Sequence, residues 1–425
     1  MEEEPKDVIV LGAIKKGAKK FGMSVWDIAE KFTKQFFDST DALNIIRPNT
    51  VLKATDCIKE QIALIKTLEQ KGFTYQIADG IYFDSSKLSD YGKLTGQNLE
   101  QLKAGARVEM VEGKKHPTDF ALWKFSYPNG RSFDFAQDDS ASRRQMEWES
   151  PWGVGFPGWH IECSAMSLKS LTDVTFDPFD KLRVDGKKNY TIDIHTGGID
   201  HIPVHHTNEI AQSEAATGKQ FVNYWVHHNF LQVEGQKMSK SLGNFYTVQD
   251  VIEKGFDPMA LRYLYLQTHY RQEMNFTWDS LKAAQTALDR LREDIQNCHS
   301  GLDPESIEIP KPVRDDTYRL HFMHAMHDDM NTPKALAIVW ELMKSDANST
   351  DKIATINVFD EVLGLELFKQ KETIIPANVL ELVEKRKKYR AEKNYTKSDE
   401  LRDEILGLGY EVLDGENGES TIKKS

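Results

Sequence analysis

The spacing of hydrophobic residues divides the first part of the chain into helical and strand-like stretches. Two segments within residues 8–70, FGMSVWDIAEKFTKQFFDSTDALNI and CIKEQIALIKTLEQKG, carry apolar residues near a 3.6-residue period, and Gly72 is placed to end the second. This pattern predicts amphipathic helices. From Phe73 to Phe125 the pattern changes to short alternating runs, including YQIADGIYFDS and ARVEMVEG, separated by glycines. Such runs predict a small strand-rich insert.

The middle of the chain predicts a parallel sheet. Apolar runs at 190–194 and 225–233 lie on either side of a histidine-rich helical segment, and strand, helix and strand in this order are typical of an α/β fold. From Val248 onward, helical patterns dominate. The last stretch predicts two helices and a short strand, and the first of these helices concentrates basic residues that form a candidate RNA-binding face: Lys385, Arg386, Lys387, Lys388, Arg390 and Lys393.

Composition indicates a multidomain globular protein of a reducing compartment. The chain has 425 residues, 40% of them hydrophobic, which exceeds one ordinary core. The three cysteines, Cys57, Cys163 and Cys298, are sparse and argue against a disulfide framework. No apolar run reaches about 18 residues and the start lacks a secretion-signal pattern, so we expect a cytoplasmic protein without a membrane segment. The formal net charge of −12 does not exclude tRNA, because local basic faces can hold it.

Three polar segments interrupt these patterns: 131–145, 175–188 and 298–310. They are rich in turn residues and show no periodicity. Long surface loops cost little free energy, so we interpret them as surface insertions rather than binding elements.

His205 and Glu209 are candidate metal ligands. They lie four residues apart, so a helix would direct both toward one point, although such a pair is also common on plain surfaces. Pro203 is expected in the first helical turn, which leaves His201 outside the helix and makes a triad of His201, His205 and Glu209 weaker. His206 should face bound nucleotide or solvent. Cys163, predicted at the end of a strand, adds a soft ligand suited to zinc, or is an inert buried thiol.

The loop EGQKMSKSLGN, residues 234–244, is a candidate phosphate clamp. Lys237, Ser239, Lys240 and Ser241 are close together before a glycine, and such cations suit the spread charge of a phosphoryl-transfer transition state. A solvated basic loop is the alternative.

Three stretches between Trp152 and Asn244 occur in a characteristic order: PWGVGFPGWHIECSAM, HTGGIDHIPVHHTNEIAQSEAA and NYWVHHNFLQVEGQKMSKSLGNF. Together they resemble the second half of the catalytic domain of cysteine–tRNA ligases, which are class I aminoacyl-tRNA synthetases. The resemblance implies an α/β fold: an incomplete Rossmann-like catalytic domain with a connective-peptide insert, followed by a helical tRNA-binding region. The implied parts are the rest of the N-terminal catalytic part (1–72), the insert (73–149), the second catalytic half with the zinc site (150–233), the lysine loop and stem-contact helices (234–300), a helical bundle (311–372) and the anticodon region (377–425).

The resemblance also implies roles for individual residues. Cys163, His205 and Glu209 match three of four zinc ligands, and the fourth, a cysteine near the family's N-terminus, has no match here. Lys237 and Lys240 match the catalytic phosphate contacts. Trp159, His195 and Asp200 are implied to contact the amino acid. Ser239, Gly197 and Gly198 are implied to contact the nucleotide. Thr196 and Ile199 depart from the family's glycine-rich loop.

The implied reaction joins L-cysteine to tRNA(Cys) through cysteinyl adenylate. ATP with Mg²⁺ is the implied substrate and one Zn²⁺ the implied cofactor. The implied oligomeric state is a monomer. The family's His-Ile-Gly-His type motif does not occur in the chain, so we expect very weak adenylation by this chain alone. Two alternatives stay open: a catalytically silent RNA-binding or zinc-binding relative, and a ligase that attaches cysteine to a small sugar amine. The C-terminal helices and the closing EVLDGENG disfavour the second.

Overall fold

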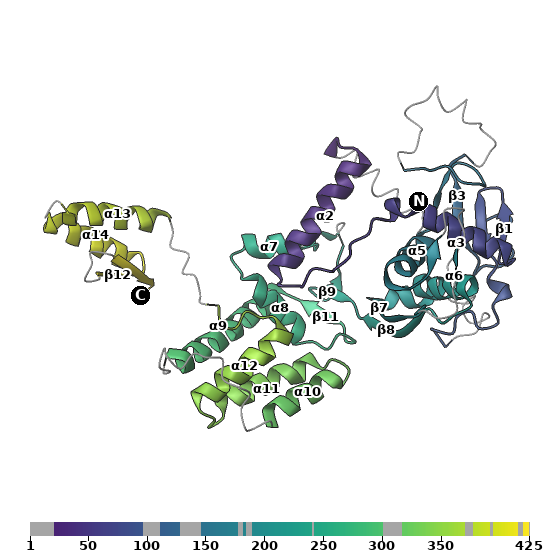
Figure 1. Ribbon diagram of the computed structural model, residues 1–425. Helices are drawn as coiled ribbons and strands as arrows, with labels where there is room; N and C mark the ends of the chain where they lie inside the picture. Colours follow the sequence, from purple (N-terminus) through teal and green to yellow (C-terminus); the bar gives the residue numbers. More distant parts are fainter. Residues whose placement is uncertain are drawn as a thin grey trace.

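The computed structural model describes residues 21–96, 111–127, 146–176, 182–183, 189–239, 242–300, 317–369, 377–391, 394–414 and 420–424 (Figure 1). It contains an α/β body, a four-stranded antiparallel sheet, a helical body and a small C-terminal unit. None of the described helices is long and apolar enough to cross a membrane.

The predicted N-terminal helices are present. Helix α2 (Val25–Ala42) begins at Ser24, whose hydroxyl accepts a hydrogen bond from the Asp27 amide while the Asp27 carboxylate accepts one from the Ser24 amide. This capping box satisfies two amides that lack a helical partner. Helix α3 (Ile58–Gln70) is followed by Gly72 at φ 78°, a left-handed conformation that favours glycine. Residues 8–20 of the predicted helical stretch lie outside the described residues.

The predicted strand-rich insert is an antiparallel sheet in the order β1 (Thr74–Ile77), β2 (Gly80–Phe83), β3 (Phe120–Phe125) and β4 (Gly155–Pro157). Strand β4 shows that the sheet extends beyond the predicted end of the insert at 149. Gly80 is required here, because a Cβ would lie 2.2 Å from the Trp123 carbonyl oxygen. The expected strand ARVEMVEG is not seen in its described part, 111–113, and its other residues are not described.

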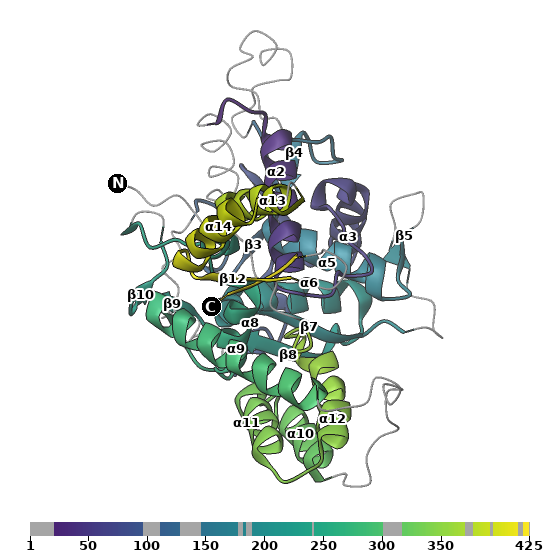
Figure 2. The same cartoon turned by 90° about the vertical axis from the view of Figure 1, so that its left-hand side faces the viewer.

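The predicted parallel pair is present and carries the site. Strands β7 (Ile192–Gly198) and β8 (Val222–His228) are parallel, and helix α6 (Thr207–Thr217) connects them. Helices α3, α5 (Trp159–Leu171) and α6 gather over this pair (Figures 1 and 2). Their shared core includes apolar side chains from all of these elements: Leu64, Leu68, Ile161, Leu168, Ile210, Ile192, Phe221 and Val222.

One face of this strand pair is exposed only in part, because Ile192 and Val222, two residues before Ile194 and Tyr224 on the same face, are buried. Ile194 and Tyr224 are paired in register and are 58% and 71% exposed. Among the described residues, β7 and β8 have no further strand beside them. Parallel sheets are normally covered on both faces, so the exposure of Ile194 and Tyr224 is unusual for a folded domain.

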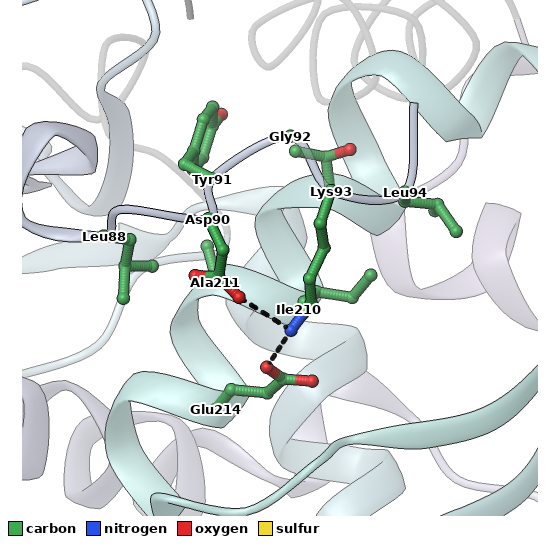
Figure 3. A pocket seen from close by; sticks show the side chains of 10 residues that line it. Leu88, Asp90, Tyr91, Gly92, Lys93, Leu94, Ile210, Ala211 and Glu214 are labelled. Atoms are coloured by element: carbon green, nitrogen blue, oxygen red, sulfur yellow. Dashed lines mark hydrogen bonds and ion pairs between the residues drawn. The ribbon is translucent and has the colours of Figure 1, made fainter. Parts of the chain in front are cut away.

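The loop Leu88–Leu94 and a salt bridge contact one side of helix α6 (Figure 3). Lys93 bridges Asp90 and Glu214, and the Tyr91 hydroxyl donates a hydrogen bond of 2.6 Å to Asn208 Oδ1. A small hollow lies between the Leu88–Leu94 loop and the helix. These contacts hold one side of α6 in place. The candidate ligand Glu209 lies on another side of the same helix.

The region after β8 is mostly helical, as predicted. A three-stranded sheet comes first, in the order β10 (Gln236–Lys237), β9 (Leu231–Val233) and β11 (Met274–Phe276). The helices that share one core are α7 (Val248–Glu253), α8 (Pro258–Leu266), α9 (Trp278–Ser300), α10 (Thr317–His327), α11 (Thr332–Lys344) and α12 (Ser349–Leu363). The chain turns between α10 and α11 at Asp329 and Met330, which both have positive φ. Arg262 donates hydrogen bonds to the carbonyls of Leu43 and Leu363, and so joins α8 to the ends of α2 and α12.

The C-terminal unit packs around its own small core. Helices α13 (Ala377–Ala391) and α14 (Tyr395–Gly407) are present as predicted, but the single expected strand is a hairpin of β12 (Tyr410–Asp414) and β13 (Ser420–Lys424). Arg386 is only 2% exposed, so including it in the basic face was wrong. Lys385, Lys387, Lys388 and Arg390 are exposed, and Lys393 lies outside the described residues.

The three polar segments are only partly described. Residues 131–145 lie outside the described part. Within 175–188, strands β5 (Thr175–Phe176) and β6 (Leu182–Arg183) form a short antiparallel pair, and Phe176 and Leu182 pack against the α/β core. This segment is therefore not wholly a surface insertion. Residues 298–300 form the end of α9, and the rest of 298–310 is not described.

Candidate metal centre and active site

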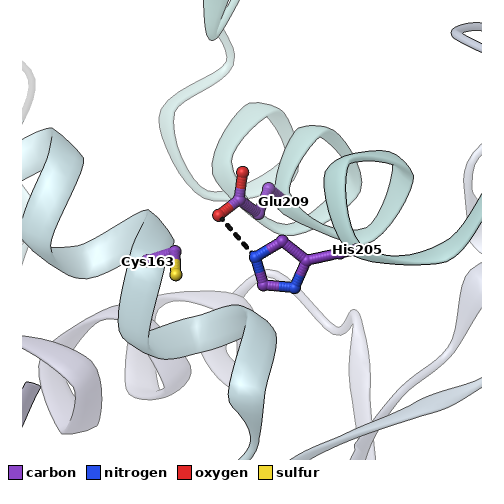
Figure 4. A group of neighbouring side chains, drawn as sticks. All are labelled: Cys163, His205 and Glu209. Atoms are coloured by element: carbon purple, nitrogen blue, oxygen red, sulfur yellow. Dashed lines mark ion pairs between the residues drawn. The ribbon is translucent and has the colours of Figure 1, made fainter. Parts of the chain in front are cut away.

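Cys163, His205 and Glu209 come together between two helices (Figure 4). One potential ligand atom from each lies within 4.8 Å of the others. His205 Nε2 is 3.3 Å from Glu209 Oε1. A thiol, an imidazole and a carboxylate at this separation are a plausible donor set for one divalent cation.

Local structure explains this convergence. Cys163 lies on α5, so the prediction of a strand end at this position was wrong; the short strand β4 ends before it. His205 belongs to a π-helical turn, Ile202–His206, which has Pro203 as its second residue and continues into α6. The i, i+4 spacing places His205 and Glu209 on the same side of this continuous helix, which packs against α5.

The burial of Glu209 suits a bound cation. The residue is 0% exposed, and neither carboxylate oxygen has a hydrogen-bond partner. Burial of an uncompensated carboxylate is costly, and a cation offsets that cost. Burial, together with the negative charge of Glu209, raises the pKa of the Cys163 thiol above its ordinary value. The thiol therefore stays protonated unless a cation stabilises the thiolate. The residues fit a zinc ion.

A second group of potential ligands shares the same carboxylate. His195 Nε2 lies 3.2 Å from Glu209 Oε2, and one nitrogen of His206 completes a set within 4.8 Å. This set contains no sulfur, so its ligand atoms are chemically harder than those of the group with Cys163. Within the described part of the chain, neither group includes His201, in agreement with the weakness expected for the triad of His201, His205 and Glu209.

His206 does not face solvent, so that part of its prediction was wrong. It is 1% exposed, and its Nδ1 lies 2.8 Å from His227 Nε2. Burial, and then the neighbouring imidazoles, lower the pKa of His206 to about 2. His206 is therefore neutral and forms part of a packed array with Trp225 and His227.

His160 was not predicted and contacts a candidate ligand directly. Its Nδ1 lies 2.8 Å from the Nδ1 of His205, and the residue is 3% exposed. The two histidines are 45 positions apart in the sequence. Neither periodicity nor ligand spacing could have paired them, because α5 and α6 meet only in the folded chain.

The three expected amino-acid contacts lie around this centre but in different environments. Trp159 packs over His205, with ring centroids 4.2 Å apart. His195 faces Glu209. Asp200 is exposed on a 3₁₀ turn, Ile199–His201, just after the carboxyl end of β7. The carboxyl ends of parallel strands are the usual position of ligand sites in α/β sheets.

Gly197 and Gly198 leave room for side chains of the site. A Cβ on Gly197 would lie 2.5 Å from Cε1 of His206 and 2.9 Å from Nδ1 of His201. A Cβ on Gly198 would lie 2.5 Å from Oδ1 of Asp200. The packing of these neighbours therefore requires glycine, whether or not a nucleotide approaches the same backbone.

The lysine loop is closed by Asn244. Its Oδ1 accepts a hydrogen bond of 2.8 Å from the Ser239 amide, and its Nδ2 donates one of 3.2 Å to the Lys237 carbonyl. Lys237 is exposed on β10. Lys240 and Ser241 lie outside the described residues.

Comparisons with known proteins agree with this architecture. Residues 9–286 match the family described as tRNA synthetases class I (C) catalytic domain, and residues 321–367 match the DALR domain. The Cysteine–tRNA ligase 1 of Burkholderia lata is 42% identical over 409 residues, which cover 96% of this chain and 78% of the relative. The cysteine–tRNA ligase of Treponema denticola is 39% identical over 437 residues, covering 96% of this chain and 82% of the relative.

A solved structure shares the fold at low identity. The methionyl-tRNA synthetase of Mycobacterium tuberculosis, bound to methionyl-adenylate, aligns with a TM-score of 0.51 and 15% identity, covering 83% of this chain and 80% of that one. Since the identity is so low, this likeness shows only a shared fold. The matches to the catalytic domain, the DALR domain and the full-length relatives show that the chain belongs to the cysteine–tRNA ligase family of class I aminoacyl-tRNA synthetases.

Proposed function

We propose that this chain acts in the ATP-dependent ligation of L-cysteine to tRNA(Cys) through cysteinyl adenylate. The observation that carries the proposal is the meeting of Cys163, His205 and Glu209 at one buried point. The relatives from Burkholderia lata and Treponema denticola carry this activity in their names. The matches do not favour a silent RNA-binding protein, and the DALR domain speaks against a ligase for a small sugar amine.

Cys163, His205 and Glu209 would hold one zinc ion. A zinc ion in this soft donor set would bind the substrate thiolate far better than a serine hydroxyl, which selects cysteine. The protein's own contribution is to present three donors at one buried place and to exclude water around them. The buried carboxylate of Glu209, with both oxygens unpartnered, supports this assignment.

Trp159, His195 and Asp200 would bind the rest of the amino acid. The indole of Trp159 covers His205 and would form a wall beside the substrate side chain. Asp200 is exposed beyond the end of β7, where its carboxylate could accept hydrogen bonds from the α-ammonium group. His195 would interact mainly with the carboxylate of Glu209, which lies 3.2 Å from its Nε2.

Lys237, Ser239 and Lys240 would hold the triphosphate of ATP, with Mg²⁺ neutralising part of its charge. Asn244 keeps the two ends of the loop together, and the exposed Lys237 side chain can move toward phosphate. Gly197 and Gly198 would allow nucleotide near the end of β7. The DALR domain and the exposed lysines of α13 would contact tRNA in the cytoplasm.

Adenylation by this chain alone is expected to be weak. Ile194 and Tyr224 are exposed on one face of the β7–β8 sheet, and the chain holds no His-Ile-Gly-His type motif. The test is cysteine-dependent exchange of pyrophosphate into ATP, measured with the chain alone and with an added polypeptide that supplies a strand and this motif. Exchange restored only by the addition supports the proposal. Exchange at ordinary synthetase rates by the chain alone contradicts the expected weakness, and failure with both contradicts the function.

A further inference from the structure

His160 contacts the candidate centre without belonging to either group of potential ligands. Its ring is enclosed between α5, on which it lies, and the π-helical turn that carries His205. Its Nδ1 lies 2.8 Å from His205 Nδ1. Its backbone carbonyl accepts a hydrogen bond of 2.6 Å from Gln212 Nε2, which ties the same residue to α6.

The contact between the two rings constrains the position of a proton. Two Nδ1 atoms at hydrogen-bond distance share one proton, so one ring donates and the other accepts. The second nitrogen of His205, Nε2, lies 3.3 Å from Glu209 Oε1 (Figure 4). A nitrogen that binds a metal needs a free lone pair. If His205 binds through Nε2, its proton must therefore be on Nδ1, and His160 must accept it.

We propose that His160 is the positioning residue that holds His205 as the Nδ1–H tautomer and so keeps the Nε2 lone pair directed at the metal site. The inference rests on the proposed zinc site. Metal-binding histidines commonly donate their second N–H to a carboxylate or a carbonyl oxygen. Here a buried imidazole takes that place.

Neighbouring aromatic rings restrict the rotation of His160. Phe120 on β3 meets it edge-on, with centroids 5.5 Å apart, and Trp159 stacks beside it at 5.6 Å. The orientation of His205 therefore depends on α5, which also carries Cys163, and on Phe120 of β3, which belongs to neither group of potential ligands.

The first test needs no metal. In the zinc-free full chain with ¹⁵N-labelled histidine, long-range ¹⁵N–¹H spectra should show His205 as the Nδ1–H tautomer. The H160N variant keeps an acceptor oxygen near the Nδ1 position and should preserve this tautomer. The H160L variant has no acceptor and should return His205 to the Nε2–H form that is common in solution. A wild-type His205 in the Nε2–H form overturns the proposal.

The second test measures zinc affinity by competition with a chromophoric chelator. We expect H160L to bind zinc about 10–100-fold more weakly, the usual effect of losing an outer partner of a ligand. H160N should stay close to wild type. The matched control is F120L, which loosens packing on the same ring but keeps the hydrogen bond, and it should also stay close to wild type. Equal losses in H160L and H160N, or in H160L and F120L, would mean that the ring only fills space.

The two tests separate this inference from the proposed zinc site. A wild-type chain that takes up no zinc, but shows the Nδ1–H tautomer of His205, contradicts the zinc assignment and leaves the His160 hydrogen bond in place. A chain that binds zinc tightly with His205 as the Nε2–H tautomer contradicts the role of His160 alone.

Discussion

Trp159 lies over the imidazole of His205, with ring centroids 4.2 Å apart and planes tilted by 30°. The indole therefore reports directly on the state of a candidate ligand. Metal binding to His205 places positive charge beside the indole face, an interaction that changes its surroundings.

We expect zinc to change the tryptophan fluorescence of the full chain through Trp159. The W159F variant should lose most of the change, whereas W123F, which removes a buried indole on β3, should retain it. The measurement is emission during zinc titration. A full signal in W159F would place the metal elsewhere.

Replacement of Cys163 by serine should remove zinc, because the group of Cys163, His205 and Glu209 loses its sulfur donor. The expected loss of affinity exceeds the roughly 100-fold that an outer-partner change can cause. Metal content after dialysis measures it. H206Q is the control, since His206 belongs only to the second group of potential ligands. Metal lost from H206Q but kept by C163S would assign the ion to that second group.

Zinc affinity should rise with pH. The pKa of the Cys163 thiol is raised by burial, so the thiol is protonated at neutral pH and must release a proton when it binds metal as thiolate. One released proton gives about a tenfold gain in affinity per pH unit. Calorimetry in buffers of different ionisation enthalpy counts this proton. A pH-independent affinity would show that the thiol is not a ligand.

The E209Q substitution should stabilise the metal-free protein and abolish zinc binding. It removes a buried carboxylate whose oxygens lack partners, which is worth about 1–3 kcal/mol in the free energy of unfolding. Thermal unfolding in EDTA and in zinc measures both effects: E209Q melts higher than wild type in EDTA and lower in zinc.

The control for this prediction is E214Q on the same helix. Glu214 pairs with the partly exposed Lys93, so its loss should change stability by less than about 1 kcal/mol. If E209Q were less stable than wild type in EDTA, Glu209 would already be compensated without metal.

The metal-free protein should lose stability as pH falls below about 6.5, the ordinary pKa of histidine. Burial lowers the pKa of four histidines in this array: His160, His195, His206 and His227. Between the ordinary and the lowered pKa, the unfolded chain binds protons that the folded chain does not, so stability decreases with decreasing pH. The effect is at most about 1.4 kcal/mol per pH unit for each histidine.

Proton uptake during denaturant unfolding at pH 5–6 measures this linkage. H227Q removes one of the four histidines and should reduce the uptake by up to one proton. Uptake unchanged in H227Q would show that His227 is protonated in the folded state.

Local sequence patterns predicted most of the elements but not all of their lengths or partners. The helical period predicted α2 and α3, and the alternation predicted β1 and β2. Cys163 was misplaced on a strand because its short segment gives little periodic signal. Arg386 was misplaced on an exposed face, since a basic residue in a basic run gives no sign of burial.

For this protein, the sequence by itself determined the family, the order of the elements and the identities of the candidate ligands. Those properties are carried by local spacing and by motifs that can be read along the chain. Only the tertiary structure decided that His160 touches His205, that His195 touches Glu209, and that Gly197 leaves space for His206. These contacts join side chains on different helices, strands and turns, and they exist because helices α5 and α6 pack together beside the parallel strands.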